Sequence, residues 1–137
     1  MKKLSFLALT AAAILFFSPD ASAQQQEPDM DKMISGMLKE YVKIFELDEV
    51  QEFLLDSVLY HNYPALIEEL NNAKKSGASN EETFTVISDK WMAKTDDALL
   101  LLLNDKQKAR FEKNGFGREK AKRDKRMAER KKAAEKL

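Results

Sequence analysis

The sequence predicts a small, curved all-α domain of four to five helices that ends in a charged, fraying C-terminal helix. Two observations predict this class. The chain has only four glycines and three prolines in 137 residues, which is few for a sheet with many turns. Large apolar residues also recur at intervals of three and four residues, the period of one face of a helix.

The first 23 residues have the layout of an export signal. Two lysines precede an apolar run over residues 4–17, and the sequence Ala-Ser-Ala at residues 21–23 suits cleavage by a signal peptidase. We expect the mature chain to begin at Gln24 and to be periplasmic. The chain has no Cys, which excludes disulfides, a thiolate metal site and the lipid-modified cysteine of a lipoprotein.

Charge is divided unevenly along the rest of the chain. Residues 24–105 carry 7 basic against 17 acidic residues, net minus ten, whereas residues 106–137 carry 14 basic against 5 acidic residues, net plus nine. We therefore expect a helical domain at residues 24–117 and a basic tail at residues 118–137. The tail holds only two large apolar residues, Met127 and Leu137, so a frayed helix or disorder is predicted there.

Capping and breaking residues divide the helical domain. A first helix is predicted over residues 29–46 and a second from Asp48, with Val50, Phe53, Leu54 and Val58 as its buried face. Pro64 should interrupt that helix and start a third segment, which ends at Gly77. Another helix is predicted from about residue 80 to 103, followed by a short helix that residues 114–117 end.

Two helix starts share one layout, in which an apolar residue precedes a capping side chain and a Gln follows three residues later. Such a Gln can accept a hydrogen bond from the backbone amide of the cap. We assign a structural role as helix caps to the six residues of the two motifs, Leu47, Asp48 and Gln51, and Leu103, Asn104 and Gln107.

This repeat resembles the Leu-Thr-x-x-Gln (LTxxQ) motif of the Spy/CpxP family of small periplasmic proteins, over roughly residues 30–113. The resemblance implies a helical homodimer that acts as an ATP-independent chaperone for partly unfolded proteins in the envelope stress response. Regulation of a membrane sensor kinase is the second role that the family implies. Asp48 and Asn104 replace both motif threonines, and each caps a helix at least as well as Thr.

The methionine-rich stripe of the first helix is the candidate client-binding surface, because flexible thioethers adapt to varied partners. It comprises Met30, Met33, Met37, Tyr41 and Phe45. The alternative is that this stripe packs as ordinary core against another helix or a second subunit.

The basic tail offers a second candidate surface. Anionic lipid head groups, acidic clients or the acidic body of a second copy are its candidate partners, and a solubilising role is the alternative; export disfavours nucleic acid. A structural envelope protein tethered to anionic surfaces through this tail is a third possible function.

Catalytic constellations are not found in the sequence. His61 is the only imidazole, so a histidine metal cluster cannot form, and the serines lack a partner base and a glycine-rich elbow. Acids near Asp48 lie in a first helical turn, where they favour the helix dipole. We expect no enzyme activity, no metal site and no cofactor.

Overall fold

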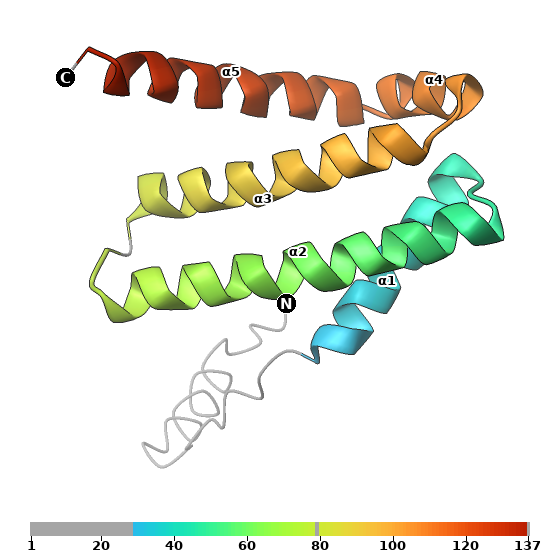
Figure 1. Ribbon diagram of the computed structural model, residues 1–137, viewed down its shortest axis with the longest axis horizontal. Helices are drawn as coiled ribbons and strands as arrows, with labels where there is room; N and C mark the ends of the chain where they lie inside the picture. The colour runs from blue at the N-terminus through green and yellow to red at the C-terminus, as the bar shows by residue number, and fades with distance from the viewer. Residues whose placement is uncertain (1–28, 79, 137) are drawn as a thin grey trace, which may run out of the picture.

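The computed structural model describes residues 29–78 and 80–136, and this part of the chain is all-α, as the sequence predicts. The predicted signal peptide and the expected start at Gln24 lie outside the described residues. α3 lies between α2 and α5, which it meets as antiparallel neighbours, and α1 crosses α2 (Figure 1). The five helices within the described residues are α1 (Met30–Phe45), α2 (Glu49–Lys75), α3 (Glu81–Leu102), α4 (Asp105–Lys113) and α5 (Phe116–Ala134).

Local capping chemistry sets the ends of these helices. The Asp29 carboxylate accepts a hydrogen bond from the Lys32 amide at the start of α1, and the Asn80 side chain accepts one from the Thr83 amide at the start of α3. Gly77, at a φ of 74°, follows the end of α2, where the sequence predicts a stop. The predicted boundaries at these positions agree with the structure to within one or two residues.

The predicted interruption at Pro64 is wrong, because α2 continues through that residue from Glu49 to Lys75. A proline inside a helix removes one backbone hydrogen bond and costs about 3 kcal/mol. Contacts on both sides of Pro64 offset this cost. Leu59 and Leu66 are buried there, and the buried Asn62 donates a hydrogen bond of 3.0 Å to the Thr95 hydroxyl of α3.

The main core lies where α1, α4, the start of α2 and the end of α3 meet. Phe45 is fully buried, and its ring centroid lies 6.2 Å from that of Phe111 and 5.2 Å from that of Phe116. Aromatic pairs at such distances stabilise a core beyond the area they bury. The buried cluster comprises Ile34, Phe45, Leu47, Leu55, Leu59, Leu99, Leu103 and Phe111.

The predicted buried face of α2 is also wrong. Val50 and Phe53 are 67% and 68% exposed and Leu54 is exposed, while Val58 is partly buried. The residues that face inward are Leu55, Leu59, Asn62 and Leu66. Gln51 explains why a different face of α2 is buried. Its side chain points inward and donates a hydrogen bond at the end of α3, so the three apolar residues beside it point outward.

The tail is a continuous helix, α5, so the predicted C-terminal helix is confirmed and the alternative of disorder is wrong for its described residues. None of its residues is fully buried, which agrees with its shortage of apolar side chains. Ion pairs to α3 supply the packing that apolar residues do not. The helix begins at Phe116, just after Gly115 at a φ of 86°, so the expected boundary at residue 117 falls inside α5.

Candidate functional site

Both predicted cap motifs form capping boxes. The Asp48 side chain accepts from the Gln51 amide at 2.8 Å, and the Asp48 amide donates to the Gln51 side-chain oxygen at 3.0 Å. Asn104 and Gln107 make the same two bonds, at 2.9 and 3.0 Å. These positions start α2 and α4, as the sequence predicts.

The two boxes are joined through their glutamines. The side-chain nitrogen Nε2 of Gln51 donates to Oε1 of Gln107 at 2.8 Å, and Nε2 of Gln107 donates to Oε1 of Gln51 at 2.9 Å. Each nitrogen also donates to a backbone carbonyl, that of Leu102 for Gln51 and that of Glu46 for Gln107. Both side chains thus use both amide hydrogens, which makes this a fully bonded polar network between two loops.

A second polar constellation joins α3 to α5. The buried Asp89 carboxylate accepts two hydrogen bonds from Arg126, at 2.6 and 2.9 Å, and one from Arg130 at 2.9 Å. Two turns further along α3, the buried Asp96 forms an ion pair with Arg123 of α5. Lys120 adds a contact of 3.1 Å to Asp97, an exposed residue beside Asp96.

The environments of the two buried carboxyls differ. Hydrogen bonds from Arg126 hold the pKa of Asp89 below its usual value, against the opposing effect of burial. Burial raises the pKa of Asp96, and the single guanidinium of Arg123 offsets this only in part. Asp89 is therefore the carboxylate whose charge stabilises the contact between α3 and α5.

Sequence reasoning does not predict this constellation, because it weighs apolar burial and charge pairs within the tail but no ion pairs between the tail and another helix. A signal was present in the spacing. Asp89 and Asp96 are seven residues apart, as are Arg123 and Arg130, so each pair lies on one face of its helix. On antiparallel helices these equal spacings bring opposite charges together.

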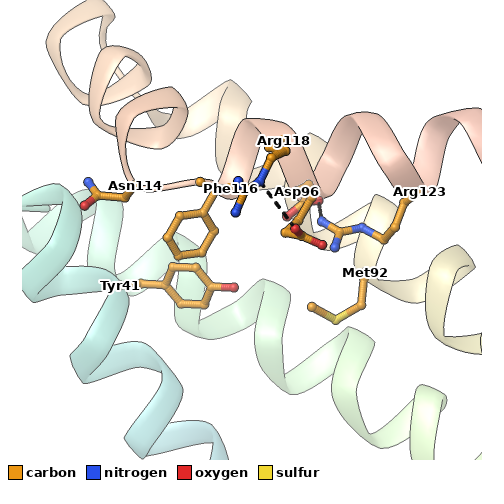
Figure 2. Close-up of a pocket in the computed structure, with 9 residues that line it drawn as sticks. Tyr41, Met92, Asp96, Asn114, Phe116, Arg118 and Arg123 are labelled. Carbon is orange, nitrogen blue, oxygen red and sulfur yellow. Dashed lines mark hydrogen bonds and ion pairs between the residues drawn. The ribbon is translucent and has the colours of Figure 1, made fainter.

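A pocket of about 320 Å³ opens beside this ion-pair cluster (Figure 2). Tyr41 and Phe116, with ring centroids 6.0 Å apart, lie on one side, and Asp96 and Arg123 lie on the other. Burial raises the pKa of Tyr41. Met92, Asn114, Gly115, Arg118 and Glu119 also line it. The lining thus has two guanidiniums and two carboxylates, so the pocket has apolar and polar sides and no net charge.

The structure places most of the predicted client-binding stripe in the core. Phe45 is fully buried, and Met30, Met37 and Tyr41 are partly buried against the core cluster. Met33 alone of the five is exposed, at 38%. Packing against other helices of the same chain, the alternative considered from the sequence, accounts for the stripe.

Four of the exposed large apolar side chains lie instead at one end of the molecule. Val50, Phe53 and Leu54 lie in the first two turns of α2, and Leu101, at 87% exposed, lies in the last turn of α3. The hydrogen bond from Gln51 to the Leu102 carbonyl brings these two turns together. We call these four residues the exposed apolar end; sequence reasoning had assigned the first three to the core.

Neither a metal-binding cluster nor a helix suited to span a membrane occurs within the described residues. No cluster of three or more His, Asp and Glu side chains is arranged to hold a metal ion there. His61 is an exposed residue of α2. None of the helices between residues 29 and 136 has the length and apolarity that a membrane crossing requires.

Comparison with known proteins finds no matching family model, no matching curated protein and no matching solved structure.

Proposed function

We propose that the protein binds partly unfolded proteins without ATP, as a periplasmic chaperone-like protein of the Spy/CpxP type acting under envelope stress. The observation that carries the proposal is the exposed apolar end. Three of its four residues are about two-thirds exposed or more: Val50 at 67%, Phe53 at 68% and Leu101 at 87%. Large apolar groups exposed at the same end of a small protein are candidates for an interaction surface.

The charges around the exposed apolar end indicate the kind of segment it would bind. Asp48, Glu49 and Asp105 are exposed beside it at the starts of α2 and α4. A client segment with apolar residues flanked by Lys or Arg would match this surface. An unfolded segment loses conformational freedom on binding, so the complex would be weak and reversible without a nucleotide.

Two features of the sequence support the same proposal. The paired cap motifs resemble the repeat of the Spy/CpxP family, and the predicted signal peptide would deliver the chain to the periplasm, where no ATP is available. Homodimer formation and regulation of a sensor kinase are further properties that the resemblance implies.

The test is suppression of aggregation, measured by light scattering of an unrelated, chemically unfolded protein at near-stoichiometric ratios. The double variant Phe53→Ser/Leu101→Ser should lose most of the suppression seen with the unchanged chain. Its melting temperature should stay close to that of the parent, because both side chains are exposed. Val86→Ser on α3 is the matched control, since Val86 is also exposed, at 40%, but lies away from this end.

If the double variant and the control suppress aggregation equally, the exposed apolar end is not the client-binding surface. If the unchanged chain suppresses no aggregation and binds one folded sensor domain, the protein is a regulatory ligand instead.

A further inference from the structure

The basic residues of α5 are sorted between its two sides. Arg123, Arg126 and Arg130 face α3, where they pair with buried carboxylates. Another side, turned away from these ion pairs, carries exposed lysines that lie three and seven positions apart, the spacing of one helical face. This basic stripe consists of Lys122, Lys125 and Lys132.

The basic stripe is free of other helices of the described chain. Apart from Phe116, which packs on α1, α5 contacts α3 and α4, and it forms the outer edge of the helical layer (Figure 1). With the described residues, its lysines make only contacts within the helix, Lys122 with Glu119 at 2.9 Å and Lys125 with Glu129 at 3.9 Å. Exposed pairs of this kind contribute little energy and leave the ammonium groups open to a partner.

The stripe also marks one pole of the molecule's charge. Residues 106–137 are net plus nine and residues 24–105 net minus ten, so a chain without net charge has two poles of opposite sign. An anionic surface therefore attracts the α5 edge and repels the acidic body, which orients the molecule with α5 against that surface.

We propose that the basic stripe docks α5 flat onto a bilayer surface of anionic lipids. A straight row of ammonium point charges suits the diffuse negative charge of a lipid surface. The arginines, whose forked geometry recognises individual phosphates, are mostly engaged by α3. The small residues Ala121 and Ala128 lie along the exposed side, so the contact is electrostatic and does not insert into the bilayer.

Nucleic acid fits the same stripe less well. Single-stranded binders combine basic grooves with aromatic platforms, and the one aromatic residue of α5, Phe116, packs against Phe45 and Phe111 in the core. This docking surface is separate from the exposed apolar end and does not rest on the proposed chaperone function.

Sedimentation with vesicles tests the docking. The chain from Gln24 onward, which retains every described residue, is mixed with vesicles of phosphatidylcholine alone or of phosphatidylcholine with phosphatidylglycerol. Binding should require phosphatidylglycerol and should weaken as salt rises from low concentration to about 0.15 M, where the Debye length is about 8 Å. Each lysine near such a surface changes binding by about fivefold.

The decisive comparison uses two variants with the same change in charge. Lys122→Gln/Lys125→Gln/Lys132→Gln, on the stripe, should lower the partition onto phosphatidylglycerol vesicles on the order of 100-fold without changing the melting temperature. Lys32→Gln/Lys39→Gln/Lys43→Gln removes three exposed lysines of α1 and should leave binding nearly unchanged.

Equal losses in the two variants, or binding to phosphatidylcholine alone, would overturn the docking surface. Binding to a single-stranded RNA probe without binding to phosphatidylglycerol vesicles would overturn the lipid assignment. Aggregation suppression is measured separately, and either result can fail without the other.

Discussion

Gln51 and Gln107 donate hydrogen bonds to each other's side-chain oxygens, over 2.8 and 2.9 Å, so the starts of α2 and α4 form one bonded unit although they are 56 residues apart. Each glutamine also accepts from its own cap amide. The third residue after each cap therefore has two roles, since it ends its own box and also bonds to the other one.

This reciprocal pair should be energetically coupled. Gln51→Ala and Gln107→Ala each remove the bonds to the other glutamine and leave the backbone amide of the residue's own cap and one backbone carbonyl without that partner, so each should lower the free energy of unfolding by about 1–3 kcal/mol. The double variant should lose less than the sum of the two, by roughly 0.5–3 kcal/mol. Urea unfolding measures all three values, and strict additivity would show that the two amides do not interact in solution.

The caps themselves should be structural. Asp48→Ala or Asn104→Ala should each lower the free energy of unfolding by about 1 kcal/mol, because an orphan amide at the helix start loses its acceptor. Glu68→Ala, at an exposed position within α2, is the control and should change stability by less than about 0.5 kcal/mol. Aggregation suppression per folded molecule should be unchanged in both cap variants; a large loss with an unaltered melt would mean that the motif binds the client.

Asp89 should make the protein sensitive to acid. Hydrogen bonds from Arg126 hold its pKa below the usual value, so its charge stabilises the fold above the unfolded pKa of about 3.9 and this contribution is lost as pH falls through the lower folded pKa. Asp89→Asn should lower the free energy of unfolding by about 2 kcal/mol at neutral pH.

The difference between the parent chain and Asp89→Asn should shrink as the pH of urea unfolding falls below about 4. Asp96, whose pKa burial raises, has the opposite pH dependence but is present in both proteins, so the comparison removes its effect. A difference that stays constant down to acid pH would show that Asp89 is not charged in the folded protein.

Removal of the tail should destabilise the protein, contrary to what its composition predicts. From composition alone, deletion of residues 118–137 should leave the body unaffected, but the structure ties α5 to buried Asp89 and Asp96. The truncated chain should remain helical and melt several degrees lower, because both carboxylates lose their cationic partners. Deletion of residues 135–137, beyond the end of α5, is the control for thermal melts followed by circular dichroism.

Much of the fold could be predicted from the sequence because it depends on local chemistry. Asp29, Asp48, Asn80 and Asn104 cap helices through bonds that reach three residues along the chain, and Gly77 stops α2 by adopting a positive φ. Such interactions are complete within one turn of backbone, so residue type and spacing are enough to identify them.

Contacts between distant segments decided the rest. The inward turn of Gln51 leaves Phe53 in solvent, the bond from Asn62 to Thr95 helps carry α2 through Pro64, and Asp89 orders α5 through two arginines. Each of these effects joins groups at least 33 residues apart. Helical periodicity states which residues share a face, but only the neighbouring helix determines which face turns inward and whether charge or apolar area covers it.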